Sequence, residues 1–138
     1  MEIRVQAHAA YRLMYHVVWI PKYRQKILVK GVERYCEKVI RNYVKDRYPD
    51  IVIEELRIME DHVHMVAIIP PKYSISSVIG GIKANSSLKM RQEFEYIRRN
   101  RAMWSVGYFV SSVGLDEEKI KKYVRYQEEQ DKGQLKIV

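Results

Sequence analysis

Two histidines with one residue between them are the first group in this chain whose types and spacing suit chemistry. His62 and His64 flank Val63 in a run of β-branched and aliphatic residues, which is typical of a strand. Side chains two apart on a strand project from the same face, about 7 Å apart at Cα, so two imidazoles can converge on one metal ion. The same pair can also be two half-buried residues that pack through their rings, and the spacing alone leaves both interpretations open.

A second candidate group lies near the C-terminus, in a segment with helical periodicity. Four residues share one helical face, namely Ile120, Tyr123, Val124 and Gln127. Such a stripe usually faces the core, but a phenol and an amide one turn apart also suit a metal-dependent site on a neighbouring sheet. Tyr126 and Gln130 have the same spacing, so geometry does not choose between the two tyrosines.

The hydrophobic pattern predicts the elements that must position these groups. Strands are expected at residues 11–20, 51–59, 62–69 and 104–113, and helices at 31–48 and 74–99. Gly80-Gly81 should weaken the second helix in its middle. A last helix is expected over about residues 116–131, capped by Asp116 and preceded by a break at Gly114. The order predicts an α+β fold of the ferredoxin-like βαββαβ type, with an antiparallel sheet, two helices on one face, and an extra C-terminal helix.

Size and composition indicate one globular domain over residues 1–138. Hydrophobic residues make up 47% of the chain and charged residues 30%, which is an ordinary folded mixture. No apolar run is long enough to span a membrane, and the first residues lack the apolar core of a secretory signal. The single cysteine, Cys36, cannot form an internal disulfide, so we expect a cytoplasmic location.

The net charge of +8 favours a polyanionic partner. Residues 21–47 hold nine Lys and Arg against three acids, and residues 83–101 hold six against two, so the charge is clustered. Solvated helix faces would give the same pattern. If the partner is nucleic acid, the candidate phosphate contacts are Lys22, Arg24, Lys26, Lys83, Lys89 and Arg91.

Taken together, these features resemble the single-tyrosine HUH transposases of small bacterial and archaeal insertion sequences, which include the REP-associated tyrosine transposases. The letters HUH denote two histidines around a bulky apolar residue, here Val63. The matching segments are, in order, Tyr15-His16-Val17-Val18-Trp19, Lys22-Tyr23-Arg24, Asp61-His62-Val63-His64-Met65, Ile82-Lys83 with Ser86-Ser87, Trp104-Ser105 with Gly107-Tyr108-Phe109-Val110 through Val113-Gly114, and Ile120 to Gln127. The last matches the pattern I-x-x-Y-[IV]-x-x-Q. A lone pair of histidines is a weak signal, whereas this ordered set is specific.

The resemblance implies that Tyr123 is the nucleophile and that His62, His64 and Gln127 bind Mg²⁺ or Mn²⁺. Tyr126 does not match the motif and stays as the one competitor. The implied reaction cleaves and rejoins single-stranded DNA through a covalent 5′-phosphotyrosine, at hairpins near the ends of the mobile element. The resemblance also implies a homodimer in which the tyrosine helix of each chain docks on its partner.

Two other interpretations remain. A replication-type nickase or a domesticated relative would keep the same chemistry. A non-catalytic RNA-binding module would use the same fold, and Gly107-Tyr108-Phe109-Val110 faintly resembles the strand by which such modules bind bases. That second interpretation leaves His62, His64, Tyr123 and Gln127 unexplained.

Overall fold

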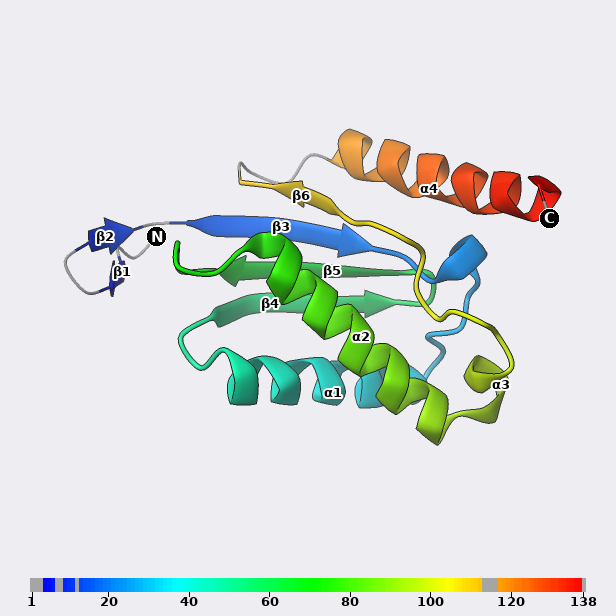
Figure 1. Ribbon diagram of the computed structural model, residues 1–138, viewed down its shortest axis with the longest axis horizontal. Coiled ribbons are helices and arrows are strands. Elements are labelled where there is room, and N and C mark those ends of the chain that lie inside the picture. The colour runs from blue at the N-terminus through cyan, green and yellow to red at the C-terminus, as the bar shows by residue number, and fades with distance from the viewer. Residues whose placement is uncertain (1–3, 7–8, 12, 113–116, 138) are drawn as a thin grey trace.

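A four-stranded antiparallel sheet forms the centre of the protein (Figure 1). The computed structural model describes residues 4–6, 9–11, 13–112 and 117–137. The strands of the sheet are β3 (Met14–Trp19), β4 (Val52–Met59), β5 (His62–Ile68) and β6 (Phe109–Ser111). They lie in the order β4-β5-β3-β6, and each neighbouring pair is antiparallel. With helical segments between β3 and β4 and between β5 and β6, the predicted βαββαβ arrangement is confirmed.

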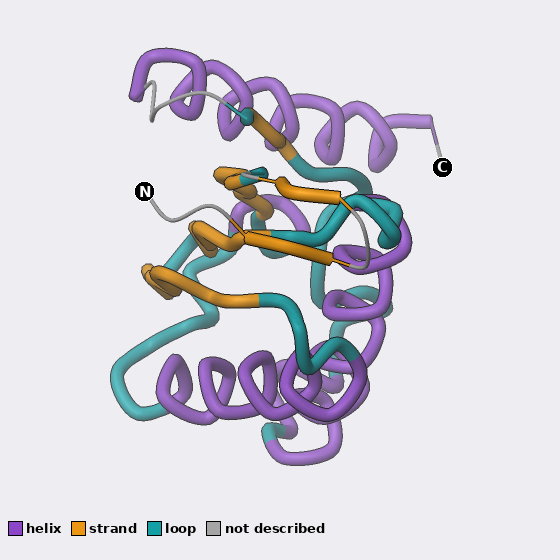
Figure 2. The backbone as a smooth tube through the Cα atoms, turned by 90° about the vertical axis from the view of Figure 1, so that its left-hand side faces the viewer, coloured by secondary structure: helices purple, strands orange, loops and turns teal. Residues whose placement is uncertain are grey.

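Helices cover both faces of this sheet (Figure 2). The helices α1 (Val32–Arg47) and α2 (Ile75–Glu93) lie against one face, and α4 (Glu117–Ile137) lies against the other. Residues of β3 alternate accordingly, because Trp19 belongs to the main core whereas Val18 packs with Val124 of α4. The C-terminal helix is therefore a separate layer on the far side of the sheet.

The helices α1 and α2 come close together at a glycine. A Cβ atom at Gly81 would overlap the hydroxyl oxygen of Tyr43 on α1, so this position leaves no room for a side chain. The helix α2 continues without a break through Gly80 and Gly81 although glycine has a low helix propensity. The start of α2 is capped by Ser74, whose Oγ accepts a hydrogen bond from the backbone N–H of Ser77 at 3.1 Å.

The helix predicted over residues 74–99 is divided at Phe94. The helix α2 ends at Glu93, Phe94 has extended backbone angles, and a short helix α3 (Glu95–Arg98) follows. The ring of Phe94 packs edge-to-face on Tyr35 of α1, with ring centroids 5.6 Å apart. The helix is thus divided at a residue that packs on α1, and the local sequence pattern did not predict this contact.

The last strand is much shorter than the predicted run of residues 104–113. Only β6 pairs as a strand, and Trp104 forms an isolated bridge with Pro21. Between them Gly107 has a φ angle of +91°, which interrupts extended backbone and which glycine adopts without steric cost.

The two ends of the chain add details that the pattern did not show. The predicted first strand begins at Met14, after a small hairpin formed by β1 (Arg4–Gln6) and β2 (Ala9–Tyr11). The predicted break at Gly114 and cap at Asp116 lie outside the described residues. In the part of the chain that the structure describes, no helix is both long and apolar enough to cross a membrane.

Candidate active site

His62 and His64 lie on the face of β5 that α4 covers. Val18 of β3 is directly opposite His64 in the antiparallel register, and residues opposite each other share a face of the sheet. Val18 packs against Val124 of α4, so this face is the one beneath the C-terminal helix. The predicted strand is confirmed, and the histidine pair lies on the same side of the sheet as the helix that carries Tyr123.

A third histidine, His16 of β3, lies next to this pair. Its Nδ1 is 3.4 Å from Nε2 of His64, and the two rings stack with centroids 5.6 Å apart and an interplanar angle of 20°. Among the described side chains, no three His, Cys, Asp or Glu residues are grouped so that they could hold a metal ion. His16 therefore adjoins His64 without completing a three-histidine site. The strand face of His16 was predictable from the sequence, because His16 and Val18 are two residues apart on one strand.

The two predicted histidine ligands have different surroundings. The Nδ1 atom of the partly exposed His62 lies 3.0 Å from Oδ1 of Asp61, so its Nε2 atom remains for another partner. His64 is buried, and this burial, reinforced by the neighbouring His16, lowers its pKa. A lowered pKa keeps the ring neutral, and a neutral imidazole has the lone pair that a metal ligand needs.

Tyr123 lies in apolar surroundings on the inner side of α4. Its ring centroid is 6.0 Å from that of Phe109 on β6. Its hydroxyl is buried and has no hydrogen-bond partner among the described residues. Burial, and secondly the negative charge of Asp131, raise the pKa of this phenol far above its ordinary value. Within the described chain, neither a hydrogen bond nor a ring contact joins Tyr123 to His62 or His64, so this arrangement does not bring the phenol to the pair.

Tyr126, the alternative nucleophile, has the opposite environment. Its side chain is 58% exposed on the outer side of α4. Because Tyr123 and Tyr126 are three residues apart on one helix, a single rotation or displacement of α4 changes the exposure of both. Exposure in this arrangement therefore does not choose between the two phenols.

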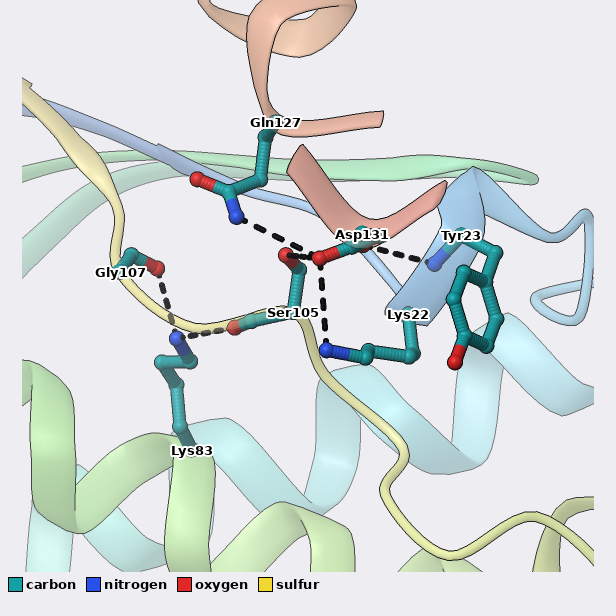
Figure 3. Close-up of polar contacts among 7 residues, drawn as sticks. All are labelled: Lys22, Tyr23, Lys83, Ser105, Gly107, Gln127 and Asp131. Atoms are coloured by element: carbon teal, nitrogen blue, oxygen red, sulfur yellow. Dashed lines mark hydrogen bonds and ion pairs between the residues drawn. The ribbon is translucent and has the colours of Figure 1, made fainter. Parts of the chain in front are cut away.

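Gln127 and Asp131 follow on the same side of α4 and belong to a polar network (Figure 3). The fully buried carboxylate of Asp131 accepts hydrogen bonds from Ser105 Oγ at 2.9 Å and from the backbone N–H of Tyr23 at 2.8 Å. The ammonium of Lys22 lies 3.4 Å away. The amide Nε2 of Gln127 also donates to Asp131, at 3.5 Å, and the lone pairs of its carbonyl oxygen Oε1 remain for another partner. These contacts seat α4 on the body of its own chain.

Sequence reasoning missed Asp131 as a site residue. The available signal was its spacing, because Tyr123, Gln127 and Asp131 follow one another at intervals of four residues on one helical face. A carboxylate on an otherwise inward-facing stripe predicts a buried polar partner. The partners themselves, in the 22–24 and 105 regions, were not predictable from the helix alone.

Lys83 of α2 supports the segment beside Gln127. Its ammonium donates to the backbone carbonyl oxygens of Ser105 at 2.8 Å and Gly107 at 2.6 Å. Burial lowers the pKa of Lys83 to about 8, and the negative charge of Asp131 acts in the opposite direction. A Cβ atom at Gly107 would lie 3.8 Å from Oε1 of Gln127, so the supported segment passes close to the amide.

The six basic residues predicted as phosphate contacts do not form one surface. Four have partners within the protein, namely Lys22, Arg24, Lys83 and Arg91. Lys26 and Lys89 are exposed and form no hydrogen bond or ion pair with a described residue. Lys83 and Arg91 line one groove of about 480 Å³, and Lys89 lines a different groove of about 530 Å³ between α1 and α2. Contact with DNA stays a prediction for all six.

The donor atoms of the predicted ligand set suit a divalent cation. Two imidazole nitrogens share one face of β5, and an amide oxygen is offered by the helix that covers this face. Imidazole and carbonyl groups are ordinary ligands of transition-metal and Mn²⁺ sites. No contact among the described residues yet joins Gln127 to His62 or His64. The three residues therefore suit the implied ion in the chemistry of their ligand atoms, and all three lie on the same side of the sheet.

Relatives of the chain in sequence are transposases. The family model described as "Transposase IS200 like" matches residues 9–127. The transposase for insertion sequence element IS200 from Salmonella typhimurium is 36% identical over 129 residues, which are 91% of this chain and 84% of that protein. The ISDra2 transposase TnpA from Deinococcus radiodurans is 23% identical over 135 residues, which cover 95% of each chain.

Solved structures of transposases share the fold. A putative transposase from Deinococcus radiodurans R1 matches with a TM-score of 0.81 at 23% identity, covering 90% of this chain and 97% of that one. A REP-associated tyrosine transposase bound to a REP hairpin matches with a TM-score of 0.56 at 13% identity, over 89% of this chain and 70% of that one. Because the family model covers residues 9–127 and the IS200 relative is 36% identical, the chain belongs to the family of IS200-like transposases.

Proposed function

We propose that this IS200-type transposase cuts and rejoins single-stranded DNA through a covalent link between Tyr123 and a 5′-phosphate. The observation that carries the proposal is the placement of two elements on one side of the sheet. The histidine pair of β5 lies on the face covered by α4, and α4 carries Tyr123 on its inner side. Family membership supports the same reaction class, because it assigns the chain to transposition.

In the proposed step the phenol oxygen of Tyr123 attacks the scissile phosphorus in line. The new bond joins Tyr123 to the 5′-phosphate, the bond from phosphorus to the 3′ oxygen breaks, and the released strand takes up a proton to end in a 3′-hydroxyl. The phenol proton passes to solvent. A different 3′-hydroxyl can then attack the phosphotyrosine and reverse the step, so no external energy source is required.

His62, His64 and Gln127 are proposed to hold a Mg²⁺ or Mn²⁺ ion. When bound, the ion would withdraw charge from a non-bridging phosphate oxygen and help to orient the phosphate for in-line attack. Two imidazole nitrogens suit Mn²⁺ better than Mg²⁺, which prefers oxygen ligands and water. We therefore expect Mn²⁺ to support cleavage at least as well as Mg²⁺.

We propose a DNA hairpin as the substrate and a two-fold homodimer as the active assembly. The related REP-associated transposase was solved with a REP hairpin, and we extend hairpin recognition to this chain. In the dimer the α4 helices would be exchanged, so that Tyr123 of one chain serves the histidines of the other. The hydroxyl of Tyr123 is buried and has no hydrogen-bond partner among the described residues, which supports a rearrangement of α4 before reaction, because a buried nucleophile must become exposed to reach DNA. We place the reaction in the cytoplasm.

The nucleophile is tested with labelled single-stranded DNA from the flanks of the protein's own gene, with Mn²⁺ or with EDTA. We expect a protein–DNA adduct that survives denaturation, requires the metal, and disappears in Tyr123→Phe while persisting in Tyr126→Phe. Loss only in Tyr126→Phe would move the nucleophile by three residues. Tight binding without an adduct from any flank would indicate a non-catalytic binding protein instead.

The exchange of helices is tested by mixing two inactive variants, Tyr123→Phe and His64→Ala. If α4 acts on the partner chain, a mixed dimer places both mutations in one composite site and leaves the other site intact. Cleavage should then return to a fraction of the wild-type rate. If α4 acts within its own chain, each chain carries one defect and no activity returns.

A further inference from the structure

Asp61, directly before the histidine pair, connects His62 to the turn that follows β3. One carboxylate oxygen of Asp61, Oδ1, lies 3.0 Å from Nδ1 of His62. The other, Oδ2, accepts a hydrogen bond from Nε of Arg24 at 3.0 Å. Both oxygens of the carboxylate are thus engaged, one by a predicted metal ligand and the other by a cation 37 residues away in the sequence.

The contact with Asp61 determines which nitrogen of His62 carries the proton. The guanidinium of Arg24 can only donate, so Oδ2 of Asp61 is an acceptor and the group is held as a carboxylate. An ionised carboxylate only accepts hydrogen bonds. The Nδ1 atom of a neutral His62 must therefore be the donor, and its Nε2 atom has the lone pair.

Arg24 is held in an unusual backbone conformation. It has a φ angle of +54° and follows Tyr23, which has a φ angle of +59°, and non-glycine residues rarely adopt this left-handed region. The backbone N–H of Tyr23 donates to Asp131 of α4, and Arg24 Nη1 lies 3.8 Å from Oε1 of Glu128 on the same helix. The turn thus contacts both α4 and the start of β5, and these contacts fix the direction of the Arg24 side chain.

We propose that Asp61 is a positioning residue that fixes the tautomer and ring orientation of His62, and that Arg24 holds Asp61 in place for this task. The inference rests on the proposed role of His62 as a metal ligand. A ligating histidine commonly donates its other ring N–H to a carboxylate, which orients the ring and raises the basicity of the coordinating nitrogen. Arg24, which we predicted from the sequence as a phosphate contact, thus has a role within the protein.

The neighbouring ligand shows why Asp61 is specific to His62. The ring of His64 contacts Nδ1 of His16 at 3.4 Å, and no carboxylate among the described residues hydrogen-bonds to it. The two imidazoles therefore differ in the partner that sets their tautomer. We expect loss of Asp61 to change the state of His62 and to leave that of His64 unchanged.

The first test reads the tautomer directly and requires neither metal nor DNA. Two-bond ¹H–¹⁵N correlation spectra of the full chain with ¹⁵N-labelled histidine are recorded at pH 8, where free imidazole is neutral, and His62 is assigned from its absence in His62→Gln. We expect a protonated Nδ1 and an unprotonated Nε2 in the wild type, and a shift toward the opposite tautomer in Asp61→Ala. A protonated Nε2 on His62 in the wild type would overturn the proposal.

The second test measures Mn²⁺ affinity by electron paramagnetic resonance of the unbound ion. The dissociation constant should rise by about 10- to 100-fold in Asp61→Ala. Glu60→Ala is the matched control, because it removes an exposed carboxylate one residue away and should change the constant by less than about twofold. If Asp61→Ala does not fold, Asp61→Asn replaces it, since an amide of the same shape binds the N–H less strongly and should still weaken Mn²⁺ binding several-fold.

The results separate this inference from the proposed reaction. Equal Mn²⁺ affinity in wild type and both Asp61 variants would overturn the positioning role even if the DNA adduct forms. The expected tautomer and affinity changes, in a protein that forms no adduct, would support the positioning role and count against the proposed cleavage chemistry.

Discussion

The carboxylate of Asp131, near the end of α4, accepts a hydrogen bond of 2.8 Å from the backbone N–H of Tyr23 in the turn after β3. The two residues are 108 positions apart in the sequence, and Asp131 is completely buried. Tyr23 also has a left-handed backbone conformation, with a φ angle of +59°. The helix α4 is therefore held by a buried carboxylate that accepts several hydrogen bonds, in addition to its apolar contacts.

Removal of that carboxylate should loosen α4. We expect Asp131→Ala to lower the free energy of unfolding by about 1–3 kcal/mol, because it removes the acceptor of the hydrogen bonds from Ser105 Oγ and from the backbone N–H of Tyr23. Urea denaturation measures the loss, and hydrogen exchange of residues 121–131 should become faster. Glu129→Ala, which removes an exposed acid from the same helix, is the control. Unchanged exchange in Asp131→Ala would show that other contacts hold the helix.

Removal of the Tyr123 hydroxyl should stabilise the protein. Among the described residues the buried hydroxyl has no hydrogen-bond partner, so Tyr123→Phe should raise the free energy of unfolding at pH 7 by about 0.5–1 kcal/mol. The exposed Tyr126→Phe should stay within about 0.5 kcal/mol of the wild type. A destabilised Tyr123→Phe would mean that the hydroxyl has a partner in solution.

The raised pKa of Tyr123 predicts that the effect of Tyr123→Phe on stability depends on pH. The folded protein holds the phenol of Tyr123 protonated above its ordinary pKa of 10.0, whereas the unfolded chain releases that proton. The unfolded state then binds fewer protons, so the wild type should lose stability relative to Tyr123→Phe as the pH rises above 10. Urea denaturation of both proteins at pH 8, 10 and 11 measures the difference. A constant difference across this range would contradict the raised pKa.

Adjacent glycines of α2 should respond oppositely to alanine. Gly81→Ala brings a Cβ against the hydroxyl of Tyr43 and should cost about 1–3 kcal/mol. Gly80→Ala meets nothing within 4 Å and should gain about 0.5–1 kcal/mol through helix propensity. The double variant Gly81→Ala with Tyr43→Phe should recover part of the loss in thermal or urea denaturation. Equal effects at the two glycines would exclude the close approach of α1 and α2.

Exposed cations without internal partners are the better candidates for DNA contact. If Lys26 or Lys89 binds a phosphate, its replacement by alanine should reduce the slope of log affinity against log salt by roughly 0.7 for single-stranded DNA. Lys45→Ala, which removes an exposed lysine on α1, is the control and should leave the slope unchanged. The slope is measured by fluorescence anisotropy with a labelled hairpin over a range of salt concentrations. An unchanged slope in both variants would show that DNA binds to a different surface of the protein.

Much of the fold was predictable because its signals are local. Strand alternation over residues 62–68 and the apolar face of α1 determine where these elements lie without reference to distant residues. The prediction was less accurate where a distant contact bends the chain. The break at Phe94 accompanies its packing on Tyr35, and the predicted last strand is interrupted at Gly107, whose φ angle is +91°.

The sequence by itself determined the order of the elements and placed His62 and His64 on one face, since neighbours two apart on a strand share a face whatever surrounds them. Only the tertiary structure decided that His16 meets His64 across 48 residues and that Arg24 holds Asp61 against His62. It alone also decided that Tyr123 packs against Phe109 with its hydroxyl buried. Side-chain partners of this kind depend on how sheet and helices pack, and local periodicity carries no information about that packing.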